Sequence, residues 1–187
     1  MTVNLVLLGN PGSGKGTHAA LLAEELNIPH ISTGDIFREH MSNRTPLGLL
    51  ILEGMNAGNY TPDDLTNQVV MERLTEPDCR NGFILDGYPR TASQVEFFRQ
   101  FYPDETLKIV LLDVPASECE ARLLVRGLTS GRADDQDVNI IHHRLQVYQE
   151  TVIPVINLYQ KNLIIISGVG EIPDVFQALK QELGVAG

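Results

Sequence analysis

A glycine-rich segment with a single lysine, Gly9–Thr17, directly follows the apolar run Val3–Leu8 and precedes a helical pattern. Glycines at such a junction let backbone N–H groups turn toward one centre, where the N-terminus of the next helix also attracts an anion. Lys15 would add a cation for phosphate, and the hydroxyl of Thr17 could contact Mg²⁺ or its waters. The usual pattern has Ser or Thr directly after the lysine, where this chain has Gly16. The segment therefore predicts a phosphate-binding loop that departs from the strict pattern.

Two further charged residues stand at positions that a ligand would explain. Asp86 follows the apolar run Phe83–Leu85, at the carboxyl end of a predicted strand, where a carboxylate could order Mg²⁺-bound waters. Arg90 opens a predicted helix, where its charge opposes the helix dipole. A turn-forming Asp-Gly pair is an alternative explanation for Asp86. Arg90 is explained better by an anionic ligand than by stability.

The apolar pattern predicts the scaffold that must position these residues. Short apolar runs without alternation indicate strands covered on both faces, and longer helical patterns separate them. We expect an open α/β fold with a parallel sheet, whose ligands lie at the carboxyl ends of the strands. The expected strands are Val3–Leu8, Pro29–Ile31, Phe83–Leu85, Ile109–Leu112 and Leu163–Ile166, and the expected crossover helices are 15–26, 91–101, 115–126, 136–160 and 172–183.

The interval between the second and third strands is longer than a crossover needs. It contains three helical patterns, at 34–43, 47–57 and 62–75. We interpret residues 32–61 as a small helical insertion in the core. A second irregular place, the glycine-flanked segment 127–131, lies between two arginines and is expected to form a flexible tip.

Composition limits the classes of function. The chain has 187 residues, of which 43% are hydrophobic and 20% charged, as in an ordinary globular domain. Its first apolar run is short and lacks preceding basic residues, and no stretch is long enough to span a bilayer, so we expect a cytoplasmic protein without a membrane partner. A net charge of −10 argues against nucleic acid as a partner. Neither the histidines nor Cys79 and Cys119 have metal-ligand spacing, so no protein metal site is expected.

The segment Gly9–Thr17 resembles the phosphate loop of the nucleoside monophosphate kinases, in which Gly-Thr follows the lysine. The resemblance continues in the family's order through Ile31–Arg38, Asp86–Arg90 and Ser130–Asp135, and adenylate kinases match best. It implies a P-loop NTPase-type three-layer α/β fold with a five-stranded parallel sheet, a helical nucleotide-monophosphate-binding insertion and a short lid. The implied organisation is one kinase domain, with core 1–31, 62–126 and 136–187, insertion 32–61 and lid 127–135.

The same resemblance implies roles for individual residues. Thr33 would lie beside the AMP base, Gln94 would hydrogen-bond adenine, and Arg122 would pack on the ATP base. The residues implied for ATP are Gly12, Ser13, Gly14, Lys15, Gly16, Thr17, Arg122, Arg126 and Gly170. Those implied for AMP are Thr33, Arg38, Asn59, Tyr60, Thr61, Gly87, Tyr88, Pro89, Arg90, Gln94, Arg132 and Arg144. Catalysis would involve Lys15, Asp86, Arg90, Arg126, Arg132 and Arg144, with Mg²⁺ bound through ATP phosphates and waters.

Two features depart from the family pattern or have a simpler explanation. Arg132 and Arg144 are one residue further apart than the family usually has them, and we expect the base of the lid to absorb the extra residue. Arg122 also stands four residues after Glu118, and this spacing alone predicts a weak surface ion pair.

The implied activity is reversible transfer of a phosphoryl group from Mg·ATP to AMP, giving two ADP, by a monomer. A UMP or CMP kinase of the same fold is the nearest alternative, and Thr33 and Gln94 favour AMP. A non-catalytic nucleotide sensor would be expected to lose a cationic phosphate ligand, whereas Lys15 and the expected arginines are all present. A GTPase switch would need an Asn-Lys-x-Asp segment, which the chain does not contain.

Overall fold

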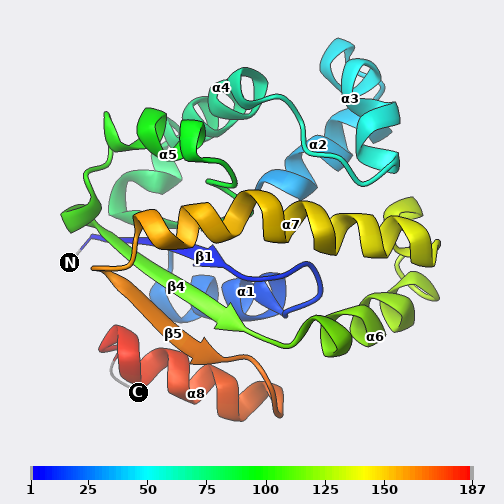
Figure 1. Ribbon diagram of the computed structural model, residues 1–187. Helices are drawn as coiled ribbons and strands as arrows, with labels where there is room; N and C mark the ends of the chain where they lie inside the picture. The colour runs from blue at the N-terminus through cyan, green and yellow to red at the C-terminus, as the bar shows by residue number, and fades with distance from the viewer. Residues whose placement is uncertain (1, 186–187) are drawn as a thin grey trace.

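Five apolar runs form one parallel sheet in a computed structural model that describes residues 2–185 (Figure 1). The sheet order is β2-β3-β1-β4-β5, so the first strand of the chain lies at its centre. All five predicted strands are confirmed, with ends that differ from the prediction by two residues or fewer. The strands are β1 Val3–Leu8, β2 His30–Ser32, β3 Gly82–Asp86, β4 Leu107–Asp113 and β5 Leu163–Ser167.

Helices cover both faces of the sheet, as its unbroken apolar strands require (Figure 1). One face packs against α4 (Asp63–Leu74), α5 (Ala92–Arg99) and α7 (Val138–Leu158) in a large cluster of buried side chains. The other face packs against α1 (Lys15–Leu26) and α8 (Ile172–Leu183) in a second cluster. This arrangement confirms the three-layer α/β fold expected from the sequence.

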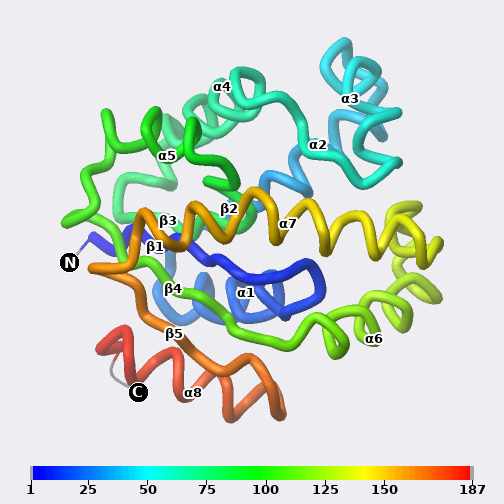
Figure 2. The backbone as a smooth tube through the Cα atoms, viewed as in Figure 1, coloured from blue at the N-terminus to red at the C-terminus, as the bar shows by residue number. Residues whose placement is uncertain are grey.

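Two pairs of helices extend beyond the sheet on the side of its carboxyl ends (Figure 2). The first pair, α2 (Thr33–Ser42) and α3 (Pro46–Asn56), has an apolar cluster of its own with Phe37 and Ile51 at its centre. The second, α6 (Ala116–Gly127) and the beginning of α7, packs around Cys119 and Leu123. The remaining elements are three short 3₁₀ turns that the sequence pattern does not predict, η1 Pro77–Asn81, η2 Asp104–Thr106 and η3 Ala133–Asp135.

The segment between Arg132 and Arg144 is not one continuous helix. The turn η3 follows Arg132 directly, and α7 begins only at Val138, where the side chain of Asp137 accepts a hydrogen bond from the backbone N–H of Asn139 at 2.8 Å. In a continuous helix, an extra residue would turn Arg144 about the helix axis relative to Arg132. Because the helix is interrupted here, the extra residue does not have this effect. Residues 136 and 137, between η3 and α7, belong to no helix and are a place where an extra residue can be accommodated.

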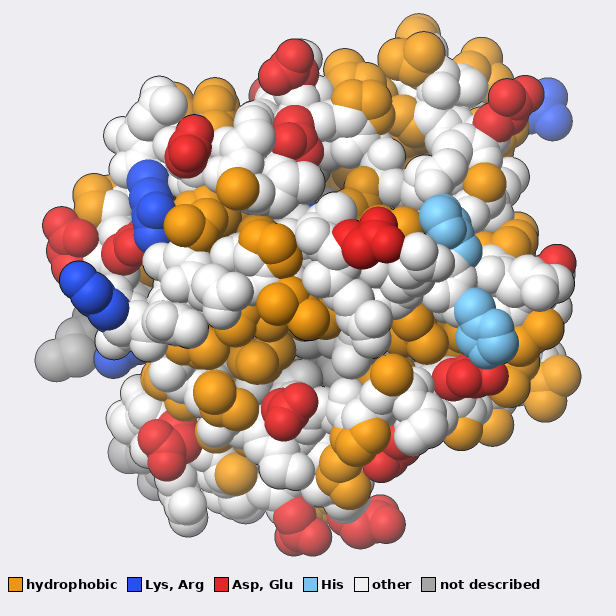
Figure 3. All heavy atoms as spheres, in the orientation of Figure 1, with side chains coloured by type: hydrophobic (Ala, Val, Ile, Leu, Met, Phe, Trp, Pro, Cys, Tyr) orange, Lys and Arg blue, Asp and Glu red, His pale blue; other side chains and the backbone are white. Residues whose placement is uncertain are grey.

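The molecular surface is acidic overall. On the face that α7 crosses, acidic side chains are scattered and basic ones lie mainly toward the edges (Figure 3). Among residues 2–185, no helix combines the length and apolarity needed to cross a membrane.

Candidate active site

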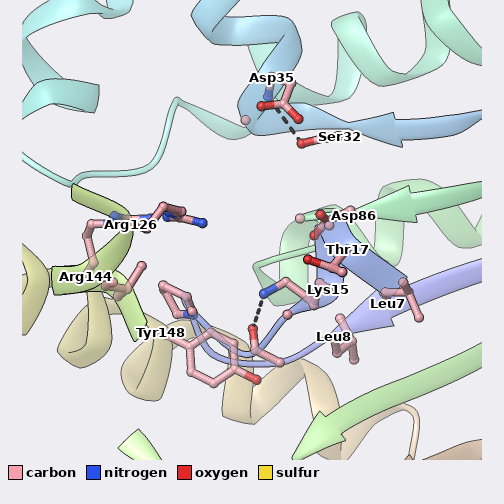
Figure 4. A pocket seen from close by; sticks show the side chains of 18 of the residues that line it. Leu7, Leu8, Lys15, Thr17, Ser32, Asp35, Asp86, Arg126, Arg144 and Tyr148 are labelled. Atoms are coloured by element: carbon pink, nitrogen blue, oxygen red, sulfur yellow. Dashed lines mark hydrogen bonds between the residues drawn. The ribbon is translucent and has the colours of Figure 1, made fainter. Parts of the chain in front are cut away.

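A cleft of about 840 Å³ opens at the carboxyl ends of the strands. Its volume is at the upper end of the range for small-molecule sites. Figure 4 shows Lys15, Thr17 and Asp86 grouped on one side, Asp35 and Ser32 across from them, and Arg126 and Arg144 at a third side. Six of the ten arginines of the chain line this cleft: Arg38, Arg90, Arg122, Arg126, Arg132 and Arg144. The arrangement concentrates positive charge in a protein whose surface is otherwise acidic.

The phosphate loop packs tightly against α6. Gly12 has a φ of +87°, and a Cβ atom there would lie 2.6 Å from the carbonyl oxygen of Cys119. Gly14, with a φ of +95°, is the residue from which α1 starts. Both positions therefore need glycine, and both glycines line the cleft at the N-terminus of α1. This is the geometry of an anion site.

Lys15 is anchored on the loop that precedes it. Its Nζ donates to the carbonyl oxygens of Gly9 at 2.8 Å and Asn10 at 2.9 Å, which leaves one N–H bond for a ligand. Burial lowers the pKa of Lys15 to about 8, and the nearby charge of Asp86 partly opposes this effect. The ammonium is thus fixed in place close to the loop.

Asp86 provides a buried anionic oxygen beside the loop. Its side chain is only 13% exposed, and Oδ2 lies 3.6 Å from Nε2 of His30 on the neighbouring strand. Burial alone would raise the pKa of Asp86, but His30 and Lys15 together lower it below its ordinary value. A Cβ at Gly16 would lie 3.6 Å from Asp86 Oδ2, which shows how closely α1 approaches the carboxylate. The carboxylate and the hydroxyl of Thr17 are hard oxygen donors of the kind that Mg²⁺ prefers.

Asp135, in η3, joins two arginines that line the cleft. Its side chain is fully buried and accepts from Nε and Nη2 of Arg126 at 2.6 and 3.0 Å, and from Nη1 of Arg144 at 2.6 Å. Asp134 also pairs with Arg144, at 2.9 Å. Burial alone would raise the pKa of Asp135, but the bonds from Arg126 and the charge of Arg144 lower it. The carboxylate keeps two like charges together at one side of the cleft.

Replacing Asp135 with asparagine is expected to lower the free energy of unfolding at pH 7 by about 1–3 kcal/mol, because two arginines lose their common anion. The folded-state pKa of Asp135 is depressed, so its contribution is present above the unfolded-state pKa of about 3.9 and is lost as pH falls through the lower folded-state value. Urea denaturation at pH 7, 5 and 3 should therefore show a deficit at the first two values that shrinks at the third. Asp137→Asn, which keeps a capping oxygen nearby, is the matched control, and equal stability of Asp135→Asn and wild type at pH 7 would refute the assignment.

Asp35 connects two arginines from opposite sides of the cleft. Its Oδ1 accepts from Nη2 of Arg38 in α2 at 2.6 Å and from Nη2 of Arg132, which precedes η3, at 3.1 Å. Burial alone would raise the pKa of Asp35, but the hydrogen bond and charge of Arg38 lower it. Helix α2 and the segment that precedes η3 are therefore linked through a single carboxylate. The sequence did not predict the pair of Asp35 and Arg132, because these two residues lie far apart in the chain.

Three predicted residues, Thr33, Thr61 and Gln94, line a smaller cavity of about 30 Å³ next to the cleft. Ser32 caps α2, since its hydroxyl accepts a hydrogen bond from the backbone N–H of Asp35 at 3.3 Å. The next residue, Thr33, instead donates from Oγ1 to the carbonyl oxygen of Gly87 at 2.9 Å.

The side chain of Gln94 is already engaged at both ends. Its Oε1 accepts from the backbone N–H of Arg90 and its Nε2 donates to Asp63, both at 2.7 Å. A ligand that bonds to this amide would have to replace one of these partners. Thr61 differs, because its buried hydroxyl has no hydrogen-bond partner within residues 2–185.

Arg122 lies between the phosphate loop and the segment after β5. It donates to the carbonyl oxygens of Ser13 at 3.4 Å and Gly168 at 3.1 Å, and the predicted pair with Glu118 is present. The phosphate loop and the segment after β5 are therefore held together by one guanidinium.

Most residues proposed from the sequence line one of the two cavities, and two do not. Ser13 is buried beneath the loop, and Tyr88 lies in the core, where its hydroxyl donates to Asn67 at 2.7 Å. Neither side chain reaches the cleft, so any contact from them would be through the backbone. The predicted residues that line the cleft are Gly12, Gly14, Lys15, Gly16, Thr17, Arg38, Asn59, Tyr60, Asp86, Gly87, Pro89, Arg90, Arg122, Arg126, Arg132, Arg144 and Gly170.

Comparison with known proteins points to one family. The family model for adenylate kinases matches residues 7–164. An adenylate kinase of Nocardia farcinica is 42% identical over 185 residues, covering 97% of this chain and 99% of the relative. An adenylate kinase of Trichodesmium erythraeum is 44% identical over 191 residues, covering 97% of each chain.

Proposed function

Because this chain belongs to the adenylate kinase family, we propose that it catalyses reversible transfer of the γ-phosphoryl group of Mg·ATP to AMP, which gives two ADP. The observation that carries the proposal is that a phosphate loop and six arginines line one cleft. The arginines come from α2, α6 and α7, from the segment after β3 and from the segment before η3. Two phosphorylated ligands bound end to end would bring their charges together at this place.

ATP is assigned to the side of the cleft formed by the phosphate loop. The backbone N–H groups of residues 12–17 and the N-terminus of α1 would hold its phosphates, with Lys15 as a cation beside them. The guanidinium of Arg122, positioned by Ser13 and Gly168, would pack on the base, and Gly170 would contribute a backbone contact.

AMP is assigned to the opposite side, between α2 and the segment after β3. Arg38, Arg90 and Arg132 or Arg144 would take its phosphate, and the smaller cavity with Thr33, Thr61 and Gln94 would widen to take its base. At about 30 Å³ this cavity is smaller than a purine, so binding requires α2 and α3 to move relative to the core.

The cofactor of the reaction is Mg²⁺, which arrives with ATP. Asp86 and Thr17 would hold it through its waters, since both present oxygen atoms beside the phosphate loop. The ion, when bound, neutralises charge that builds up on the transferring group.

The chain's own part in the chemistry is positioning and charge. The attacking atom is an oxygen of the AMP phosphate, so no separate protein nucleophile is needed. Lys15, Arg90, Arg126, Arg132 and Arg144 surround the place where the phosphoryl group passes and stabilise the negative charge that spreads over it.

Closure would protect the reaction from water. We assign the insertion to residues 32–61 and the lid to 127–135, and Asp35 joins them through Arg38 and Arg132. Closure brings donor and acceptor together and excludes water as a competing acceptor. The proposal also takes the chain to act as a monomer in the cytoplasm, as its resemblance to short-lid adenylate kinases implies.

The proposal is tested by incubating the purified chain with Mg·ATP and each of AMP, CMP, UMP and GMP. ADP should form rapidly with AMP, and ATP and AMP should form from ADP alone, as resolved by anion-exchange chromatography. Preference for CMP or UMP would keep phosphoryl transfer and refute the assignment of Thr33 and Gln94 to adenine. Binding of ATP without transfer to any acceptor would indicate a nucleotide sensor instead.

A further inference from the structure

Arg90 is held differently from the other arginines that line the cleft. Those five each pair with a carboxylate: Arg38 and Arg132 with Asp35, Arg122 with Glu118, and Arg126 and Arg144 with Asp135.

Within the described part of the chain, Arg90 has no carboxylate at ion-pair distance. Its Nε donates to the carbonyl oxygen of Gly87 at 2.6 Å, and its Cζ lies 4.5 Å from the centre of the Tyr60 ring. The guanidinium also passes close to Gly87, where a Cβ atom would lie 2.5 Å from its Nη2. Arg90 is thus oriented by one backbone carbonyl and one aromatic face.

An aromatic partner has a consequence that a carboxylate would not have. A carboxylate takes up N–H donors at the edge of the guanidinium and neutralises its charge. A ring contacts the flat face of the cation and leaves the edge, with its N–H groups, available for phosphate oxygens. Held in this way, Arg90 keeps its Nη groups for the oxygens of a phosphate, while its Nε stays on the carbonyl oxygen of Gly87.

We propose that Tyr60 is a positioning residue that orients Arg90 for phosphoryl transfer, an inference that rests on the proposed kinase activity. Tyr60 contributes its ring from the link between α3 and α4, so it belongs to the return of the insertion rather than to the core that carries Arg90. Arg90 is then fully oriented only when the insertion lies against the core.

The neighbours of Tyr60 in this link fix its position. Asn59 Oδ1 and His143 Nε2 of α7 are 2.8 Å apart, and a Cβ at Gly58 would lie 2.8 Å from Cγ of Arg144. The ring of Tyr60 itself packs against the larger core cluster. Three successive residues, 58–60, therefore hold this link against Arg90 and the first half of α7.

The test compares Tyr60→Leu with Tyr60→Phe. Loss of the ring should lower kcat about tenfold, whereas phenylalanine, which keeps the ring, should keep kcat within about twofold of wild type. The KM for ATP should stay unchanged in both variants, because Tyr60 is assigned to the acceptor side. Phe101→Leu, an exposed aromatic outside the cleft, controls for loss of an aromatic side chain and should leave kcat unchanged. Urea midpoints are measured for every variant, and Tyr60→Met replaces Tyr60→Leu if the latter does not fold.

A double-mutant cycle with Arg90→Ala decides whether the effect passes through Arg90. In that background, removal of the Tyr60 ring should change kcat by less than about twofold, because the cation that it orients is gone. An undiminished tenfold loss, or equal losses in Tyr60→Phe and Tyr60→Leu, would overturn the proposal. If the wild-type protein transfers phosphate to no acceptor, the kinase activity itself is refuted. If the wild type is active and Tyr60→Leu is equally active, only the role of Tyr60 is refuted.

Discussion

Lys15→Met is expected to lower kcat by about 10³-fold or more, because the variant loses a cation aimed at the transferring phosphates. Methionine has nearly the same length and can fill the same space, so the loss reports charge and donors rather than packing. In the wild-type chain the ammonium is held by two loop carbonyls, which fix its distance from the phosphates before the reaction begins. Initial rates with Mg·ATP and AMP measure the effect.

The control for this variant is Lys161→Met, since Lys161 is exposed and does not line the cleft. ATP binding, measured by calorimetry, should weaken much less than kcat falls in Lys15→Met if the lysine acts mainly in the transition state. If folded Lys15→Met has a kcat within tenfold of wild type, Lys15 is not one of the catalytic residues.

Arg90→Ala should cost about 10³-fold in kcat, because an arginine that stabilises phosphoryl transfer contributes about 10³ to 10⁵. The expected loss is large because, within residues 2–185, no carboxylate lies at ion-pair distance from Arg90. Its positive charge is therefore not neutralised by the protein and is available to the ligands. Steady-state kinetics with AMP varied at saturating Mg·ATP separates the effect on kcat from the effect on KM.

Arg80→Ala provides the comparison, because Arg80 is exposed and lies away from the cleft. A rise in the KM for AMP with kcat unchanged would mean that Arg90 binds ground state and transition state equally. In that case Arg90 would be an AMP ligand only, and the proposed role of Tyr60 would lose its basis.

The fold was largely predictable because its signals are local. The run Val3–Leu8 and the glycine loop after it determine where β1 ends and α1 begins, and both elements have the predicted bounds. The short turn Pro77–Asn81 was not predicted, because a single 3₁₀ turn buries too few side chains to give a periodic pattern of apolar residues in the sequence.

The sequence predicted which cationic residues form the candidate site. It predicted less well which carboxylates pair with them. Lys15 and the arginines could be recognised by their place in motifs, and the structure brings them to one cleft. Only Glu118, four residues before Arg122, could be predicted as a partner from spacing. The distant partners could not, because Asp35 and Arg132 meet only after the sheet and both helical extensions have formed. Tyr88 illustrates the opposite error, since it belongs to a recognisable motif while its side chain is a core residue.

The central position of β1 in the sheet bears on how the chain folds during synthesis. β1 ends at Leu8, yet its two neighbours, β3 and β4, begin only at Gly82 and Leu107. At translation rates of about 5–20 residues per second, the first strand waits roughly 4–15 seconds before its earliest partner leaves the ribosome. An apolar strand without a partner for that time is exposed to aggregation. Nascent chains that stop short of β3 should therefore bind holding chaperones, and those that extend beyond β4 should release them.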